Sequence, residues 1–145
     1  MPAVTVTNAV TRASITFTPT LSVGANLTVA AFGDTVGDVQ FAPLSNRFAR
    51  DTSNVGVRFF NGASSAGALF IQRNGVALTP SVGFGAASSF VSVPTDSASI
   101  TFSNGTFVVL DAGLMAFPPG ENSTALIGRP AVGTSRLRFF TVQGC

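Results

Sequence analysis

Residues Val55–Phe102 read VGVRFFNGASSAGALFIQRNGVALTPSVGFGAASSFVSVPTDSASITF. In this stretch, short apolar runs rich in valine, phenylalanine and isoleucine alternate with Asn-Gly, glycine and proline. Such punctuation is typical of consecutive antiparallel strands. Asn74-Gly75 is a strong hairpin signal, because a type I′ turn needs a positive φ at both of its central positions. Asn104-Gly105 predicts a second hairpin in the same way.

The alternation continues on both sides of this stretch. Ala3–Thr7 (AVTVT) and Arg12–Thr18 (RASITFT) have the period of a strand with one buried face. No segment of helical period exceeds two turns. We therefore predict an all-β fold, an antiparallel Ig-like β-sandwich with an internal, partial repeat. The predicted strands are Ala3–Thr7, Arg12–Thr18, Ala25–Phe32, Val39–Ala42, Val55–Asn61, Gly67–Arg73, Ser88–Val93, Ser97–Phe102, Thr106–Leu110, Leu114–Phe117, Ser123–Ile127 and Leu137–Val142.

The repeat rests on landmarks that recur in the same order. Ala13–Phe17 and Ala98–Phe102 both read ASITF, and a G-x-N-x-T segment follows each, at Gly24–Thr28 and at Gly120–Thr124. A glycine and a closing strand then follow in both copies. Ordered landmarks of this kind indicate an internal duplication. The block 55–93 has no counterpart, so we predict a partial β unit over 1–46, a linker over 47–54 and a complete β-sandwich unit over 55–145.

Composition narrows the functional classes. Of the 145 residues, 46% are hydrophobic and only 10% are charged, against a usual charged share of about 25%. All eight basic residues are arginine, and the net charge is only +2, which does not favour nucleic-acid binding. The apolar runs are too short to span a bilayer. No signal-peptide pattern opens the chain, which leaves either a mature chain whose leader is absent or a cytoplasmic protein. All-β chains rich in threonine, serine, glycine and asparagine and poor in charge are commoner on cell surfaces than in the cytosol, so we expect an extracellular protein.

Several segments resemble a known family. The order VRFFNGA (Val57–Ala63), a strand ending in Asn74-Gly75, and VGFGAASSFVSVP (Val82–Pro94) resembles the bacterial domain-of-unknown-function family 4397. Gly24–Gly33 and Val108–Gly113 look like later strands of that family. The usual tyrosines of the family are absent. The resemblance implies secreted or surface-attached Ig-like repeats and no assigned catalytic residues.

The side chains offer little for catalysis. There is no histidine, the usual group for acid–base chemistry near neutral pH. The carboxylates all lie in or beside predicted turns. Asp34 and Asp38 are placed to bind Ca²⁺ across their loop, although turn aspartates that bond their own backbone are commoner. We expect no enzyme activity, no cofactor and no metal. Cys145 ends the chain and has no partner for an internal disulfide. Three N-x-S/T sequons, at Asn26, Asn104 and Asn122, are either glycosylation sites or Asn-led turns.

Two pairs of adjacent phenylalanines, Phe59-Phe60 and Phe139-Phe140, lie in predicted strands. Adjacent strand residues face opposite sides, so one of each pair points away from the sandwich core unless the strand is covered on both faces. Arg136 and Arg138 share a face of the last strand, with Arg129 and Arg58 nearby. They form either a ladder for acidic glycans or carboxylates of a partner, or a solvated face that protects an edge. The candidate subunit-interface residues are Val4, Val6, Phe59, Phe60, Arg136, Arg138, Phe139 and Phe140.

The missing half of the first unit suggests a function. Either the half unit folds back on the complete one and merges with it into a single sheet system, or another subunit supplies what is absent, and we favour the second. We therefore predict an extracellular structural subunit that self-associates into a surface filament or layer by strand addition. The donors would be the terminal segments Pro2–Thr7 and Leu137–Val142. The alternative is a monomeric cell-surface binding or adhesion module for a glycan or a protein.

Overall fold

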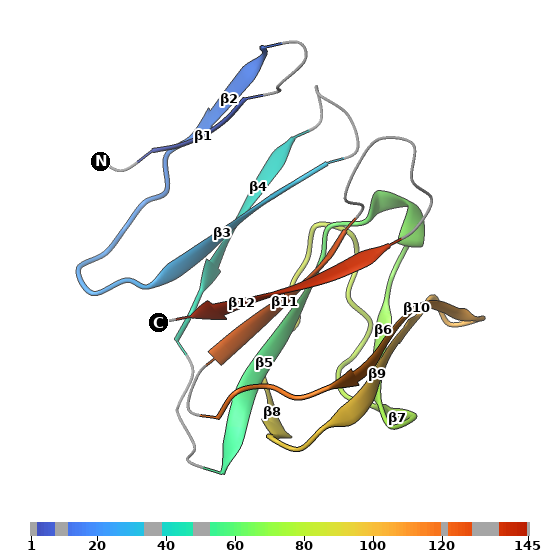
Figure 1. Ribbon diagram of the computed structural model, residues 1–145. Coiled ribbons are helices and arrows are strands. Elements are labelled where there is room, and N and C mark those ends of the chain that lie inside the picture. Colours follow the sequence, from blue (N-terminus) through green and yellow to red (C-terminus); the bar gives the residue numbers. More distant parts are fainter. Residues whose placement is uncertain are drawn as a thin grey trace.

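The computed structural model describes residues 3–7, 12–33, 39–47, 53–119, 122–128 and 137–144 (Figure 1). These residues form strands and one short 3-10 helix, η1 (Ser64–Ala66), and no helix among them is long and apolar enough to cross a membrane. The strands are β1 (Val4–Thr7), β2 (Ser14–Phe17), β3 (Leu27–Phe32), β4 (Gln40–Ser45), β5 (Asn54–Asn61), β6 (Phe70–Arg73), β7 (Val76–Ala77), β8 (Val91–Pro94), β9 (Ala98–Ser103), β10 (Val108–Met115), β11 (Asn122–Gly128) and β12 (Arg138–Gly144).

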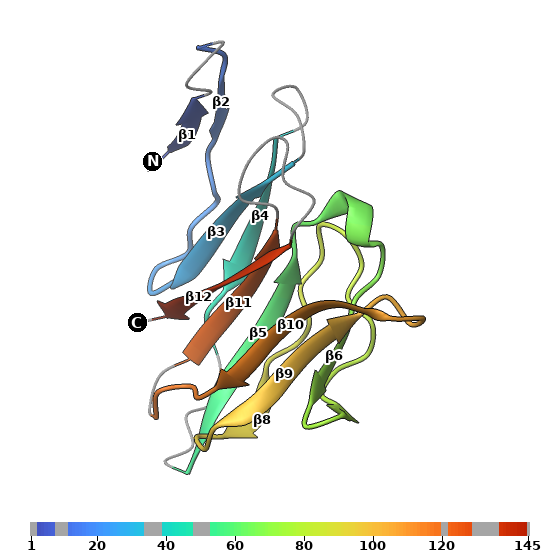
Figure 2. The ribbon, with the colours of Figure 1, turned by 45° about the vertical axis from the view of Figure 1, so that its right-hand side comes forward.

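Two four-stranded sheets form a sandwich (Figures 1 and 2). One has the strand order β12-β11-β5-β8 and the other the order β10-β9-β6-β7. The predicted all-β class and the antiparallel sheets are confirmed. One pair departs from the prediction, because β11 runs parallel to β5. A parallel neighbour needs a long connection, and β11 is separated from β5 in the sequence by β8 of the same sheet and by the four strands of the opposite sheet.

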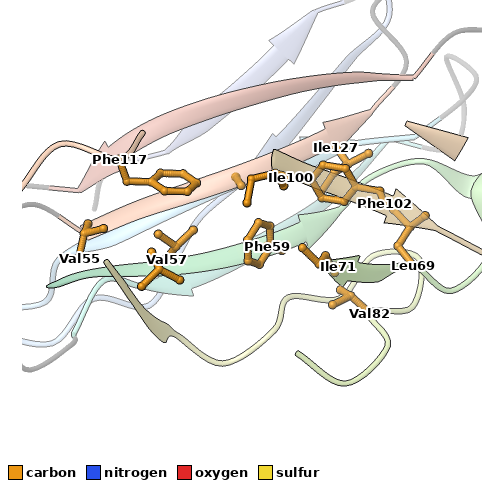
Figure 3. Close-up of a cluster of buried hydrophobic side chains, with 12 residues drawn as sticks. Val55, Val57, Phe59, Leu69, Ile71, Val82, Ile100, Phe102, Phe117 and Ile127 are labelled. Carbon is orange, nitrogen blue, oxygen red and sulfur yellow. The ribbon is translucent and has the colours of Figure 1, made fainter. Parts of the chain in front are cut away.

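Apolar side chains fill the space between the two sheets (Figure 3). Val55, Val57 and Phe59 of β5 face Ile71 of β6 and Phe102 of β9. The rings of Phe59 and Phe102 meet edge to face, with their centroids 6.0 Å apart. These side chains come from alternate positions of each strand, as expected where one face of a strand is turned to a core. The stretch 55–102 therefore supplies most of the core by itself.

The opposite face of β5 is also covered. Phe60 is only 2% exposed and packs with Ala30 of β3 and Leu44 of β4. The β3–β4 hairpin thus folds back over the outer face of the sheet that contains β5 and β11. The β3–β4 hairpin therefore folds back on the complete unit, which was the less favoured of the two alternatives for the half unit. It packs on that unit without merging into its sheet, because β3 and β4 pair only with each other. The division of the chain at 47–54 stays a prediction.

The hairpin β1–β2 forms a further two-stranded sheet beyond β3–β4 (Figures 1 and 2). Phe17 of β2 stacks on Phe41 of β4, with the ring centroids 5.3 Å apart and the planes at 13°. The molecule is therefore a series of layers, with two four-stranded sheets followed by two hairpins. Each layer is held to the next mainly by side chains.

Some predicted elements differ in the structure. Thr106–Leu110 and Leu114–Phe117 were predicted as two strands, but one strand, β10, covers both regions. It shifts register between Val108 and Leu110 and again between Asp111 and Gly113. β-Bulges bend a strand and disturb its alternation of side chains, which is why the sequence reads as two runs. At the Asn74-Gly75 turn both φ angles are positive, as predicted.

Both ASITF segments lie in strands, β2 and β9. The strands that follow, β3 with β4 and β11 with β12, each form an antiparallel hairpin. The pairing of the two ASITF strands differs, since β2 pairs with β1 whereas β9 lies between β6 and β10. The duplication itself stays a prediction.

We expect Phe60→Ala to lower the free energy of unfolding by about 3–5 kcal/mol, because it removes a buried aromatic ring under the β3–β4 hairpin. The control is Phe107→Ala, at an exposed phenylalanine, which should change stability by no more than about 0.5 kcal/mol. Urea unfolding followed by circular dichroism measures both. Equal, small effects would mean that the hairpin does not cover Phe60 in solution.

Candidate functional site

Arg58 is the most heavily bonded side chain at the junction between the first hairpins and the sandwich. Its residue is only 4% exposed. Nε donates to Thr124 Oγ1 of β11 at 2.9 Å, and Nη1 donates to the Ser45 carbonyl at 2.6 Å. Nη2 donates to Asn46 Oδ1 at 2.7 Å and to the Leu44 carbonyl at 3.3 Å. One guanidinium therefore joins β5, β11 and the end of β4.

Asn46 extends this cluster to β3. Its Oδ1 accepts hydrogen bonds from Arg58 and also from Thr28 Oγ1, at 3.1 Å. Its Nδ2 donates to Asn26 Oδ1 at 2.7 Å, and its backbone N–H donates to the Asn26 carbonyl at 2.9 Å. The two predicted G-x-N-x-T segments thus meet here, because Thr28 belongs to one and Thr124 to the other. We call these five side chains, Asn26, Thr28, Asn46, Arg58 and Thr124, the arginine cluster.

The charge of Arg58 has a structural role, because it holds β4 and β11 against β5 in what we call the arginine clamp. Burial lowers the pKa of the Arg58 guanidinium because desolvation disfavours the charged form. The group nevertheless stays protonated, since arginine is not deprotonated in proteins. The face of the Phe90 ring lies 4.8 Å from the guanidinium carbon and adds a cation–π contact. Arg58 is therefore not available as part of a surface ladder for acidic glycans, which corrects that interpretation for this residue.

An open apolar groove of about 290 Å³ lies beside the β3–β4 hairpin. Residues 29–33 line one side of the groove and residues 126–128 of β11 line the other. Phe60 and Gly62 also line it, and Phe140 of β12 completes the wall. The lining side chains among the described residues are uncharged, and most of them are apolar.

Strand β12 borders the groove and is the last strand of its sheet. It pairs with β11 over seven residues in unbroken register, from Asn122 opposite Gly144 to Gly128 opposite Arg138. Arg138, Phe140 and Val142 alternate and therefore share one face of the strand. Phe140 is 49% exposed and Val142 is also exposed. The free edge of β12 thus carries backbone donors and acceptors next to uncovered apolar side chains.

The structure separates the predicted interface residues. Phe59 lies in the core and Phe60 under β3–β4, so both are packed within the chain. Val4 and Val6 lie on the β1–β2 hairpin, Val4 exposed and Val6 half-buried. Phe60 and Phe140 come together in the groove. The rest lie on or near β12: Arg138 is exposed, the side chain of Phe139 is outside the described part of the chain, and so is Arg136.

The sequence did not identify the β3 side of the groove or the role of Asn46. The sequence of β3 did carry a sign of this, since Leu27–Phe32 (LTVAAF) is apolar on both faces of the strand apart from Thr28. Such a pattern is expected for a strand that is covered on both faces. Asn46 carries no such signal, because an asparagine after a strand reads as an ordinary turn residue.

The remaining polar candidates have local roles. Asp111 Oδ1 accepts from the Gly113 N–H, and Asp96 pairs with Arg73 at the surface. Asp34 and Asp38 lie outside the described residues, as does Cys145. Within the described ranges, no three acidic, histidine or cysteine residues cluster as metal ligands would. Asn104 leads a turn through its Oδ1, and Asn122 is buried.

No protein-family model matches the chain, and no curated protein matches it either.

We expect Arg58→Lys to destabilise the protein by about 2–3 kcal/mol. A single ammonium cannot reach Thr124 and the carbonyls at the end of β4 together, and each hydrogen bond to a charged group contributes roughly 1.5–3 kcal/mol. Arg73→Lys is the matched control, because Arg73 pairs with Asp96, whose side chain is 65% exposed, and such pairs contribute about 0–1 kcal/mol. Urea unfolding compares the two, and indistinguishable losses would contradict the clamp.

Two neighbouring hydroxyls on β11 should respond in opposite directions. Ser123 Oγ is buried without a hydrogen-bond partner among the described residues, whereas Thr124 Oγ1 accepts from Arg58. Ser123→Ala removes an unpaired polar atom and should raise stability by about 1 kcal/mol, while Thr124→Val should lower it by about 1–3 kcal/mol. The same unfolding assay measures both. A destabilising Ser123→Ala would show that this hydroxyl is bonded in solution.

Proposed function

We propose that the protein is an extracellular structural subunit that self-associates through the free edge of β12 and builds a surface filament or layer. The observation that carries this proposal is the contrast between β12 and the other edges of the sandwich. An edge strand that is long, regular and apolar recruits further strands, whereas natural monomers protect such edges.

The other three edges of the sandwich are protected. β10 is interrupted by two shifts of register, and Asp111 and Gly113 flank the second of them. β7 has only two residues, and β8 has four and ends at Pro94, which has no N–H to donate. β12 has seven residues in regular register. Of the four edge strands of the two four-stranded sheets, only β12 is both long and regular.

Pairing of β12 with β12 of a second copy gives hydrogen-bond partners to the backbone N–H and C=O groups at this edge. In an antiparallel pair centred on Thr141, Phe140 of each copy lies opposite Val142 of the other. Arg138 then lies opposite Gly144, so the two arginines stand at opposite ends of the pair and do not repel each other directly. The four outward apolar side chains cover one another, and the two sheets become one continuous sheet across the contact.

The energy of this contact is modest. Phe140 and Val142 are already partly covered, and full burial of such a side chain contributes roughly 1.5–3 kcal/mol. Each therefore gains about 1 kcal/mol on pairing, before the cost of association. Contacts of this strength suit an assembly in which many weak contacts act together.

The composition supports an extracellular setting. Few charges and many serine, threonine, glycine and asparagine residues give an uncharged polar surface, and the outer face of the β1–β2 hairpin is an example. There Thr5 bonds Thr16 at 2.9 Å and Thr7 bonds Ser14 at 2.8 Å through their hydroxyls.

The second candidate is a monomeric binding or adhesion module, and the groove beside β3 favours it. Its volume of about 290 Å³ and its mixture of apolar side chains with exposed backbone groups suit a side chain of a protein ligand or part of a glycan. Phe140 lies in the groove and next to the β12 edge, so both candidate functions use this residue. They differ in whether the protein self-associates or stays monomeric without a ligand.

We expect Phe140→Lys with Val142→Lys to abolish the β12-linked dimer and to lower the average mass of the assemblies, because lysines at an edge oppose strand pairing. Size-exclusion chromatography with light scattering over a concentration series measures the change.

The matched control is Val108→Lys with Leu114→Lys, which places the same charges on exposed positions of β10. This variant should assemble like the wild type. If wild-type protein stays monomeric at every concentration, self-association is wrong and the binding module takes its place.

A further inference from the structure

The β1–β2 hairpin has one apolar and one polar face. Residues opposite each other in its register lie on the same face. The apolar face consists of Val4 opposite Phe17 and Val6 opposite Ile15. The polar face consists of the hydroxyl pairs Thr5–Thr16 and Thr7–Ser14. An isolated two-stranded hairpin is marginally stable in water, so this hairpin depends on a surface that covers its apolar face.

The outer face of β3–β4 provides that surface. In the register of this hairpin, Ala31 lies opposite Phe41 and Val29 opposite Pro43. Phe41 receives the stacked ring of Phe17. Within the described residues, β1 and β2 form no ladder with any other strand. Among the described strands, the hairpin is therefore attached by side-chain packing and by its covalent connection and not by strand pairing.

The connection to β3 is long and is exposed except at Pro19, which is buried. Thr18–Asn26 has nine residues, which span up to about 30 Å when extended. It contains one turn, in which the Ala25 N–H donates to the Ser22 carbonyl at 3.0 Å. Val23 in this turn is fully exposed, and Gly24 has a φ of +75°. Opening this turn costs little and lets the hairpin reach a neighbouring molecule.

We infer that the β1–β2 hairpin is exchanged between copies and docks on the β3–β4 face of a neighbour through the contacts that it makes within its own chain. This inference rests on the proposed self-association. The occupant is a second copy because the stacking of Phe17 on Phe41 within one chain shows that the hairpin and the β3–β4 face make a specific contact. Exchange of an identical element is a low-cost route to assembly, since the same contacts form in both states.

Exchange also gives the assembly a contact that propagates from copy to copy, which the β12 contact does not. An antiparallel pair of identical strands is two-fold symmetric, so it closes as a dimer and goes no further. Donation of a hairpin from one copy to the next is head-to-tail and propagates unless it closes as a ring. The two contacts together give an open filament of dimers, and at high local concentration the neighbour competes effectively with the chain's own hairpin.

The first test changes the length of the connection and leaves every contact residue in place. Six Gly/Ser residues inserted after Val23 favour docking within the chain, whereas deletion of Leu21–Gly24 hinders it. We expect the insertion to reduce assemblies to β12-linked dimers and the deletion to give longer ones, by analytical ultracentrifugation at matched concentrations. Identical size distributions for both variants and the wild type would overturn exchange. Dimers that persist in all three would leave the β12 proposal intact.

The second test identifies the molecule that receives the hairpin. Cys145 is the one native cysteine, so Cys145→Ser gives a thiol-free background. Phe17→Cys is made in one such protein and Phe41→Cys in another. The two are mixed, allowed to assemble and treated with a short bis-maleimide. Exchange predicts a covalent heterodimer on denaturing gels, lost on adding the six-residue insertion.

Control reactions contain each single-cysteine protein alone. Assemblies that give no heterodimer above these controls would overturn exchange while self-association stands. If nothing assembles at all, both the exchange and the β12 proposal are wrong.

Discussion

Strand β5 is covered on both faces, and the rest of the structure depends on this constraint. Val55, Val57 and Phe59 face the sandwich core, and Arg58 and Phe60 face the β3–β4 hairpin. A strand in this position cannot carry an unpaired charge, because burial of a charge without partners is very costly. Arg58 therefore needs acceptors from both sides, and the residues at the end of β4 must lie where they do. The position of the β3–β4 hairpin thus depends on the residues of strand β5.

Much of this arrangement could be predicted from the sequence, because alternation of residues reports which positions face inward. The hairpin at Asn74-Gly75 and the core strands of 55–102 follow from local chemistry alone. Adjacent Phe59 and Phe60 also indicated that β5 is either exposed or covered on its second face. Local pattern could not decide which segment provides the cover. The parallel pairing of β11 with β5 and the fusion of two predicted runs into the bulged β10 are likewise tertiary outcomes.

The candidate site was predictable only in part, for a related reason. Phe140 was identified because a second phenylalanine precedes it on a strand, and it does line the groove. Arg58 was grouped with the arginines near the end of the chain because it occupies a similar place in its strand. Sequence spacing does not show that Thr124 lies beside it in a parallel neighbour, or that the backbone carbonyls of β4 point at its guanidinium. Exposure of an arginine depends on such long-range partners.

The chemistry of the acceptors around Arg58 has a consequence for the conditions that the molecule tolerates. Its hydrogen-bond acceptors among the described residues are a hydroxyl, an amide oxygen and two peptide carbonyls, and none of these groups gains or loses a proton between acidic and alkaline solution. A clamp of arginine with carboxylates would weaken as the carboxylates became protonated in acid. The attachment of β4 to the sandwich through Arg58 is therefore expected to hold in acid, where a pairing of arginine with carboxylates would be lost.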